Sequence, residues 1–204
     1  MLKLKSHLPK LFYKVNKITY GKGLKMIGWP FLFRYPKASL ELGRDVSINS
    51  SFFSNLLGLY QRTIIIARGE GKIHIGDGVG ISGSTIYARK EITLGNHVLV
   101  GANTKIVDND FHPLDAEARN ANDFSKLVCK PVRIGDNVFI GCNCLILKGT
   151  EIGANSIIGA GSVVSGKFPE NVVIAGNPAR IIRKVGDDEV NNRVSGEKDL
   201  CEGR

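Results

Sequence analysis

From Ile134 onward, an isoleucine or valine returns at every sixth position of the sequence. These anchor residues are Ile134, Ile140, Ile146, Ile152, Ile158 and Val164. In a helix, which turns about 100° per residue, six-residue steps would place successive anchors on three different faces. In an extended chain all even offsets share one face, so short strands joined by tight turns would direct every anchor inward. The period therefore predicts an all-β solenoid, a parallel β-helix with three short strands in each coil.

Three earlier stretches repeat this pattern less regularly. They begin at Leu42, Ile75 and Leu94, and in each of them a glycine follows the first apolar residue. We therefore expect about five to six coils between residues 40 and 180. The pattern breaks between about residues 108 and 131, which predicts a long inserted loop at that point.

One further irregularity precedes the inserted loop. The step from Tyr87 to Leu94 is seven residues, one more than the period. The extra residue predicts a bulge within Arg89–Glu91.

The residues outside the repeats predict two flanking segments. Residues 1–39 form a basic leader without Asp or Glu. The leader is predicted to be helical, because apolar residues recur among its lysines at three- and four-residue steps: Leu4, Leu8, Leu11, Phe12 and Val15. Such a helix would cap the open strand edges of the first coil, the role we favour, or contact an anionic membrane, and both roles can coexist. Residues 186–204 are polar and mixed in charge, which predicts a loosely docked tail.

The repeat and the sequence near its end resemble the hexapeptide-repeat acyltransferase family. Besides the period, the resemblance rests on Val-Ile-Ala-Gly-Asn-Pro-Ala-Arg at residues 173–180, and it covers roughly residues 40–185. It implies that residues 40–185 fold as a left-handed β-helix, opposite to the usual hand of parallel crossovers. It also implies a homotrimer that transfers acetyl groups from acetyl-CoA. The sequence looks most like the sugar O-acetyltransferases of the maltose and galactoside type and those of capsule and lipopolysaccharide synthesis.

The composition indicates a single domain with a narrow, mostly aliphatic core, and the net charge favours anionic partners. The 204 residues are 43% hydrophobic but 7% aromatic, and the formal net charge is +9. Coenzyme A phosphates, a nucleotide sugar or an anionic membrane surface would each suit that charge, whereas the sequence has no nucleic-acid-binding motif. There is no apolar run of about 18 residues and no signal peptide. We therefore expect a cytoplasmic enzyme, which could also attach peripherally to the inner face of the membrane.

The cysteines and most histidines have plain interpretations. The cysteines are Cys129, Cys142, Cys144 and Cys201. Their spacing is not typical of a metal site and favours reduced thiols. The γ-class carbonic anhydrases share the prism and bind zinc through three histidines, two of them five positions apart. Here the steps from His74 to His97 and from His97 to His112 are 23 and 15 residues, so no metal is expected.

Candidate chemistry lies where the repeat breaks. The inserted loop resembles the His-Pro-x-Asp-x-x-x-Arg segment of sugar acetyltransferases, and the matching residues are His112, Pro113, Asp115 and Arg119. By that resemblance His112 is the general base. Acetyl transfer to a hydroxyl needs the hydroxyl proton removed as the oxygen attacks, and an imidazole with a pKa of about 6.5 can take and return it at neutral pH. Asp108, Asp110, Asp115 or a backbone carbonyl could orient the ring, and the sequence does not choose among them.

The second half of the solenoid supplies candidate contacts for acetyl-CoA, assigned by resemblance. These are Phe139, Gly141, Cys142, Ala160, Ser165, Gly166, Lys167, Arg180 and Arg183. Gly141 and Cys142 would line the pantetheine arm and offer a backbone N–H to the developing oxyanion. The chain departs from the family pattern twice. Phe139 replaces the common tryptophan, and Ser165–Lys167 replaces the usual Thr-Lys, which moves the lysine by one place.

The acceptor is expected to be a sugar hydroxyl, and its candidate contacts are Ser82, Ser84, Tyr87 and Arg119. Serine acetyltransferases are set aside because they carry a larger N-terminal helical domain. The acyltransferases of lipid A synthesis are set aside because they carry a helical C-terminal domain. Two alternatives remain, an N-acetyltransferase acting on a nucleotide-linked amino sugar and a non-catalytic β-helix scaffold. The presence of His112 in the loop argues against the scaffold.

Overall fold

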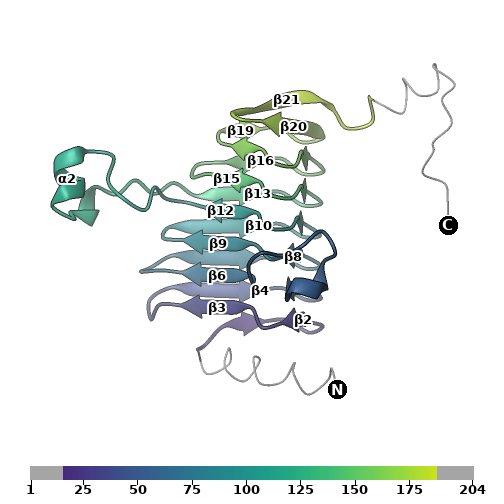
Figure 1. Ribbon diagram of the computed structural model, residues 1–204, viewed down its shortest axis with the longest axis horizontal. Helices are drawn as coiled ribbons and strands as arrows, with labels where there is room; N and C mark the ends of the chain where they lie inside the picture. The colour runs from purple at the N-terminus through teal and green to yellow at the C-terminus, as the bar shows by residue number, and fades with distance from the viewer. Residues whose placement is uncertain (1–15, 188–204) are drawn as a thin grey trace, which may run out of the picture.

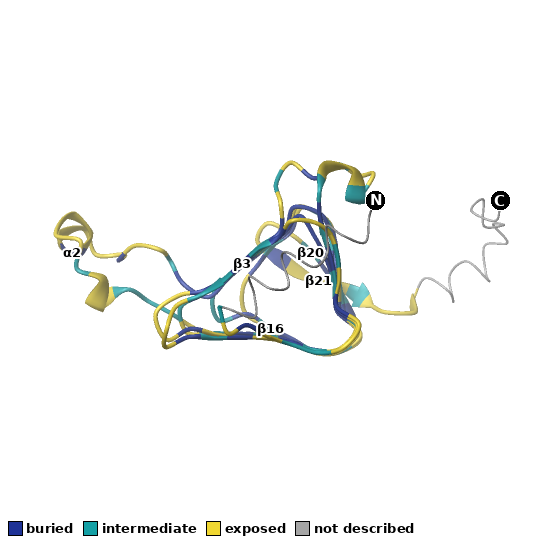
Figure 2. Cartoon of the chain, turned by 90° about the horizontal axis from the view of Figure 1, so that it is seen from below, coloured by how far each residue is buried: buried dark blue, intermediate teal, exposed yellow. Residues whose placement is uncertain are grey.

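The computed structural model describes residues 16–187, which form a parallel β-helix (Figure 1). Three sheets make the faces of a prism that is triangular in cross-section (Figure 2). We name the sheets A, B and C in the order in which the chain visits them. The inserted loop leaves one edge of the prism as a long arm, and a shorter excursion leaves another edge.

Each sheet takes every third strand of the solenoid. Sheet A contains, in spatial order, β1 (Thr19–Tyr20), β4 (Ser39–Leu42), β7 (Lys72–Ile75), β10 (Glu91–Leu94), β13 (Val132–Ile134), β16 (Glu151–Ile152) and β19 (Lys167–Phe168). Sheet B contains β2 (Lys25–Gly28), β5 (Ser47–Ser50), β8 (Gly80–Ser82), β11 (Leu99–Val100), β14 (Phe139–Ile140), β17 (Ile157–Ile158), β20 (Val172–Gly176) and β21 (Ala179–Lys184). Sheet C contains β3 (Phe31–Arg34), β6 (Ile64–Ala67), β9 (Thr85–Ala88), β12 (Lys105–Val107), β15 (Leu145–Ile146) and β18 (Val163–Val164).

The strands stack as successive coils. Within residues 16–187, three-strand coils run from β1–β3 to β16–β18, and β19 and β20 begin one more. These strands pair in parallel with the coils above and below. β21 reverses direction and pairs antiparallel with β20, which closes the C-terminal end of sheet B.

The core is a set of aliphatic ladders, as the period predicts. In sheet B, the register aligns one ladder of inward residues: Ile48, Ile81, Val100, Ile140, Ile158 and Ile174. None of these side chains is more than 3% exposed. Alternation along single strands explains this, since β7 exposes Lys72 and His74 while it buries Ile73 and Ile75. Branched side chains pack well on such a pleated surface, so the hexapeptide anchors form the interior.

Glycine and asparagine shape the turns between sheets A and B. A Cβ on Gly135 would lie 2.7 Å from the backbone nitrogen of Ala154 in the next coil, so only glycine allows the coils to stack there. Asn137, Asn155 and Asn171 adopt positive φ at successive turns. Their amides form a ladder, with Asn137 Nδ2 donating to Asn155 Oδ1 at 3.0 Å and Asn155 Nδ2 to Asn171 Oδ1 at 3.1 Å.

The predicted helical leader over residues 1–39 is wrong from Thr19 onward, because the first coil, β1–β3, occupies residues 19–34. Inward residues of this coil follow the six-residue period at Ile18, Leu24 and Pro30, which are all buried. Lysines at the outward positions made this segment look basic rather than periodic. The helix predicted over Leu4–Val15 lies outside the described residues. Residues 188–204 of the predicted tail also lie outside them.

Two excursions interrupt the coils at different edges of sheet C. Residues 51–62 leave the edge between sheets B and C and contain the short helix η2 (Phe52–Ser54). Residues 108–131 leave the edge between sheets C and A and contain α2 (Ala116–Asn120) and η3 (Phe124–Lys126). No helix within residues 16–187 is long and apolar enough to cross a membrane.

Candidate active site

The inserted loop is anchored to the prism by Asp108, the residue that follows β12. Its carboxylate accepts hydrogen bonds from the backbone N–H groups of Arg89, Lys90 and Glu91, at distances from 2.6 to 3.1 Å. Its backbone carbonyl accepts the N–H of Lys130 at 2.9 Å. Asp108 is fully buried. The two ends of the loop are therefore held together at one point of the coil.

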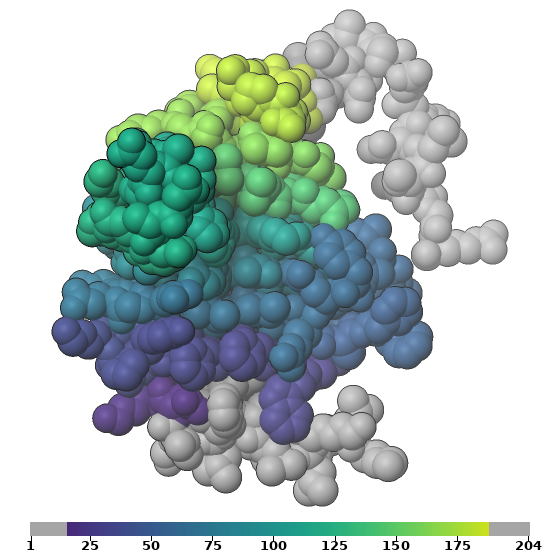
Figure 3. Space-filling view, turned by 60° about the vertical axis from the view of Figure 1, so that its left-hand side comes forward, coloured from purple at the N-terminus to yellow at the C-terminus, as the bar shows by residue number. Residues whose placement is uncertain are grey.

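Beyond this anchor the loop projects as an arm. Asn109 and Cys129 form an antiparallel bridge that keeps its two strands side by side at the base. Figure 3 shows the arm as a separate lobe standing off the coils. Burial raises the pKa of the Cys129 thiol, so it stays protonated at neutral pH. Cys129, Cys142 and Cys144 are all free thiols in the described chain.

His112 lies on this arm with its side chain exposed. Its backbone N–H donates to the carbonyl of Asp110 at 2.7 Å, and the following residue, Pro113, is buried. The imidazole lies 6.1 Å from the ring of Phe124, centroid to centroid. The guanidinium of Arg89 lies over the same Phe124 ring, 5.8 Å from its centroid. Backbone and aromatic contacts thus place the ring beside the prism, open to a substrate.

The three carboxylates that were expected to orient His112 have other partners in this chain. Asp108 binds the backbone of residues 89–91, as described above. Asp110 pairs with Lys148, whose Nζ lies 2.5 Å from Oδ1, and its Oδ2 is buried without a partner among the described residues. Asp115 caps α2 by accepting the N–H of Ala118 at 2.8 Å. None of these three candidates hydrogen-bonds the His112 ring within the described residues 16–187.

Arg119 also serves the loop itself. Its Nη1 donates to the carbonyls of Pro113 and Leu114, at 3.1 and 2.9 Å. Together with the Asp115 cap, this closes the turn that carries the histidine. Asp115 and Arg119 of the His-Pro-x-Asp-x-x-x-Arg pattern therefore serve the fold of the loop through these hydrogen bonds, although both side chains are exposed, as that of His112 is. Arg119 keeps an exposed side chain, but its hydrogen bonds assign it to the loop rather than to an acceptor.

The predicted acceptor residues separate into two places. Tyr87 lies beside the loop, with its ring 5.0 Å from that of Phe111 and its hydroxyl accepting from Arg68. Ser82 and Ser84 lie at the other edge of sheet C, where the chain passes from β8 to β9. Ser84 is fully buried, and its hydroxyl bonds to backbone groups, including the carbonyl of Gly101 at 3.0 Å. The prediction that Ser84 contacts the acceptor is therefore wrong, because its hydroxyl is already hydrogen-bonded within the turn.

Sequence reasoning missed an aromatic hollow on the outer face of sheet C. Its volume is about 250 Å³, and its lining residues are Phe31, Phe33, Tyr35, Ile66, Arg68 and Tyr87. The rings of Phe33 and Tyr35 pack edge to face, with their centroids 5.4 Å apart. The hollow continues from Tyr87 towards Phe111 of the loop. Alternating aromatic residues in the first coil could have suggested it, had that coil been recognised.

The predicted acetyl-CoA contacts are also divided between the edges. Phe139, Gly141, Cys142 and Ala160 lie on sheet B and at its edge with sheet C. Phe139 is 47% exposed, and Ala160 is exposed. The N–H of Gly141 donates to the carbonyl of Ile158 at 2.8 Å, so it cannot also serve an oxyanion. Arg180 and Arg183 lie on β21 at the C-terminal end of the same sheet.

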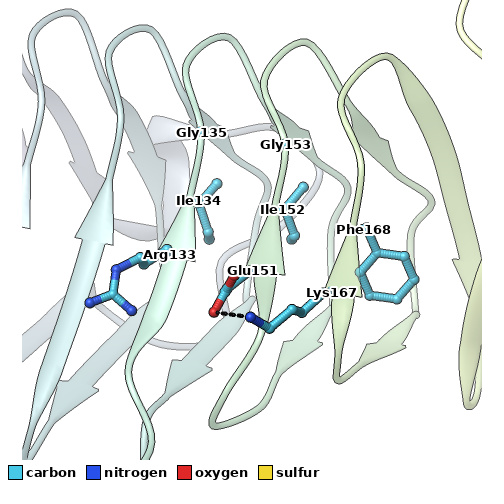
Figure 4. Close-up of a pocket in the computed structure, with 8 residues that line it drawn as sticks. All are labelled: Arg133, Ile134, Gly135, Glu151, Ile152, Gly153, Lys167 and Phe168. Carbon is cyan, nitrogen blue, oxygen red and sulfur yellow. Dashed lines mark ion pairs between the residues drawn. The ribbon is translucent and has the colours of Figure 1, made fainter.

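Ser165, Gly166 and Lys167 lie elsewhere, between β18 and sheet A. Lys167 forms an ion pair with Glu151 at 3.1 Å on the outer face of sheet A (Figure 4). The shallow groove around this pair is also lined by Arg133 and Phe168. One chain therefore does not bring these three residues together with Phe139 and Cys142, and Lys167 has a local partner for its charge.

His112 and the candidate cofactor residues Cys142 and Ala160 thus lie at opposite edges of sheet C, whereas Ser165–Lys167 share the edge with sheet A with His112. His112 follows β12 at the edge with sheet A, whereas Cys142 and Ala160 precede β15 and β18 at the edge with sheet B.

Comparison with known proteins agrees with this architecture. The family described as bacterial transferase hexapeptide (six repeats) matches residues 131–166. The galactoside O-acetyltransferase of Lactococcus lactis is 32% identical over 159 residues, which are 78% of this chain and 69% of that protein. A putative lipopolysaccharide biosynthesis O-acetyl transferase of Escherichia coli, WbbJ, is 37% identical over 75% of this chain and 78% of its own. This chain belongs to the hexapeptide-repeat acyltransferase family.

Two solved acyltransferase structures share this fold over most of the chain. A galactoside acetyltransferase solved in complex with coenzyme A is 25% identical, with a TM-score of 0.53 over 89% of this chain and 71% of that chain. An N-acyltransferase from Bacillus cereus, 19% identical with a TM-score of 0.62, shares the fold over 92% of this chain and 94% of its own. The fold is thus the left-handed parallel β-helix of this family, and the chain is an acyltransferase.

Proposed function

We propose that this enzyme is an acetyl-CoA-dependent O-acetyltransferase that acts on a sugar hydroxyl in surface polysaccharide or lipopolysaccharide biosynthesis. The observation that carries the proposal is the exposed His112 imidazole on an arm that is rigidly anchored at Asp108. The relatives named as galactoside and lipopolysaccharide O-acetyltransferases support a sugar acceptor. The coenzyme A complex of the galactoside enzyme supports the donor.

His112 acts as the general base in this mechanism. Its imidazole takes the proton of the acceptor hydroxyl as that oxygen bonds to the acetyl carbon. The carbon–sulfur bond of the thioester then breaks, and the proton passes to the departing sulfur. Phe124 packs beside the ring and limits its rotation, while the Asp110 carbonyl fixes the backbone from which it projects. No covalent intermediate on the enzyme is required.

The edge between sheets B and C has the character expected of a coenzyme A site. Phe139 offers an exposed apolar face, and Cys142 and Ala160 follow at the turns of two successive coils. A thin, mostly apolar pantetheine arm suits such a shallow edge. Arg180 stands exposed at the C-terminal end of sheet B, where its charge would suit a phosphate group. These residues would hold acetyl-CoA, which supplies a thioester carbonyl to the reaction.

We further propose that the active unit is a homotrimer with three equivalent sites. The support is geometric, because His112 and Ala160 lie at opposite edges of sheet C in one chain. A three-fold arrangement would let each arm reach the B–C edge of the next chain. We place the enzyme in the cytoplasm, where acetyl-CoA is made, with residues 1–15 available to cap the first coil or to contact the inner face of the membrane.

A substrate screen tests the proposed reaction. Acetyl-CoA consumption should be measured against simple glycosides, amino sugars and lipid-linked oligosaccharides, with product mass to locate the acetyl group. We expect an ester on a sugar hydroxyl and none with His112→Ala. His74→Ala is the matched control, because His74 is exposed on sheet A beside Glu41, away from the arm. Acetylation of an amino group alone would refute the O-acetyltransferase assignment.

A further inference from the structure

The excursion over residues 51–62 exposes large apolar side chains to an unusual degree. Phe53 is 84% exposed and Leu56 is 97% exposed, and Phe52, Leu57 and Tyr60 are each more than 60% exposed. Figure 2 shows the excursion standing at the edge between sheets B and C. Single apolar residues on a surface need no explanation, but a contiguous group of this size marks an interaction site.

The excursion is a built structure. Its C-terminal part is fixed to the prism, because Leu59 is buried and Asn103 binds both the carbonyl of Gly58 and the N–H of Tyr60. Its first turn is closed by reciprocal hydrogen bonds between Ser51 and Ser54. The polar groups at the base are thus satisfied by the prism, and the outer turn presents mainly apolar side chains.

The neighbouring first coil extends this apolar surface. Trp29 is 53% exposed and Ile27 is 48% exposed. Gly28, which lies between them, pairs with Ser50, from which the excursion departs. Trp29 therefore lies beside the base of the excursion. Aromatic residues with a polar edge, such as Trp29 and Tyr60, are typical of the boundary between lipid and water.

The described part of this end of the molecule is cationic. Residues 16–69 contain eight Lys and Arg residues and two acids, Glu41 and Asp45. Arg62 lies over the ring of Phe31 and Lys105 over the ring of Tyr60, so cations border the apolar group directly. Residues 70–204 carry slightly more acids than bases. Arg62 and Lys105 therefore place positive charge beside the exposed apolar residues.

We propose that the surface formed by Ile27, Trp29 and residues 51–62 binds an anionic lipid bilayer, with Phe53 and Leu56 entering the region of the headgroups. Apolar side chains and cations on one surface match the two attractions of such a membrane, since its interface takes up Phe, Leu and Trp and its headgroups attract Lys and Arg. A surface that binds another protein would be expected to carry fewer cations that lack an acidic neighbour. This inference concerns docking and does not depend on the acetyl-transfer reaction.

Vesicle binding by the full chain tests the proposal. Co-sedimentation should be measured with phosphatidylglycerol–phosphatidylcholine vesicles and with phosphatidylcholine vesicles, at low and high salt. We expect binding to the anionic vesicles that weakens as salt rises. Trp29 is the only tryptophan in the sequence, so its emission reports this surface and should shift to shorter wavelength on binding.

A paired substitution isolates the excursion. Phe53→Ser with Leu56→Ser should lower vesicle affinity by about tenfold or more, because two large side chains no longer leave water. The melting temperature should change little, since both side chains are exposed in the folded chain. Ile182→Ser is the matched control, because Ile182 is 61% exposed on β21 at the opposite end of the prism. It should bind vesicles as the parent does.

Three outcomes would overturn the proposal. The first is that the parent does not bind anionic vesicles at low salt, and the second is that the double variant binds as tightly as the parent. A change in solution mass caused by the double variant would mean that a second copy covers the surface instead. A truncation that removes residues 1–15 completes the set. If it abolishes binding while the double variant does not, the leader alone contacts the membrane.

Discussion

The carboxylate of Asp108 accepts the backbone N–H of Lys90 at 2.6 Å, across the boundary between two coils. The N–H groups of Arg89 and Glu91 point at the same carboxylate. Successive amides that converge in this way form a concave anion site, and here the anion is a side chain of the protein. By register Ile86 is equivalent to Ile146 and Leu94 to Ile152, so the step before Leu94 is eight residues where the regular coil has six. This longer turn supplies the N–H groups that anchor the loop inserted after Val107.

Replacing Asp108 with Ala should damage stability and turnover together. The substitution leaves backbone donors without their acceptor in a buried site, at a cost of about 2–4 kcal/mol. The arm would also lose its anchor, so kcat should fall while binding of coenzyme A is kept. Urea unfolding and steady-state kinetics would measure both effects. Asp115→Ala is the comparison within the same arm, because it removes the cap of α2, at about 1 kcal/mol, and leaves the Asp108 anchor in place. Equal losses in the two variants would argue against an anchoring role for Asp108.

His112→Ala should lower kcat by a factor of about 10² or more, the usual contribution of a general base. Coenzyme A affinity should change little, because His112 is assigned to the proton of the acceptor hydroxyl and not to holding the cofactor. Steady-state assays and calorimetric titration with coenzyme A would separate the two effects. The control His74→Ala should keep its full turnover. Comparable turnover in the parent and the His112 variant would exclude this mechanism.

Much of the fold could be predicted because one physical signal repeats. Each hexapeptide anchor packs against its equivalent in the next coil, so the period survives in the sequence from Ile134 to Val164. The first coil was missed although Ile18, Leu24 and Pro30 keep the same period. Exposed lysines dominate that segment, and outward residues do not determine the fold of a strand. Periodicity therefore has to be sought among inward positions alone.

The site was less predictable, because sequence specifies residue types but not their partners. His112 could be singled out from its motif, but the motif does not reveal that Asp115 caps a helix or that Arg119 binds the loop backbone. Asp108 was grouped with the other loop carboxylates, yet it alone is fully buried. Each of these assignments depends on contacts between segments that are distant in sequence, such as Arg89 and Asp108.

Thiol labelling should distinguish the edge between sheets B and C from the interior. Cys144 is buried and burial raises the pKa of its thiol, so it should react slowly with iodoacetamide. Cys142 is half-buried at the candidate pantetheine site and should react faster. Acetyl-CoA, whose sulfur is held as a thioester and does not react with iodoacetamide, should slow the labelling of Cys142 and leave Cys129, at the base of the arm, unaffected. Peptide mapping would measure each rate. Protection of Cys129 with no protection of Cys142 would contradict the placement of the cofactor at the edge between sheets B and C.

The proposed trimer makes a quantitative prediction about mixed assemblies. His112→Ala removes the base from one edge of sheet C, whereas Ala160→Trp would fill the opposite edge, where Ala160 is exposed. Each variant alone should be nearly inactive. In a trimer that contains both chains, one of the three sites combines an intact His112 with an intact Ala160 from the neighbouring chain.

Co-expression of the two variants in equal amounts should therefore restore about one quarter of the parent activity, since three quarters of randomly formed trimers are mixed and each has one intact site. Differently tagged chains allow the mixed trimers to be purified, and mass measurement confirms that they have formed. Activity in those trimers requires that the arm of one chain completes the site on another. If purified mixed trimers are as inactive as each variant alone, each chain must build its site by itself. A solution mass equal to one 22.2 kDa chain with full activity would rule out the shared site directly.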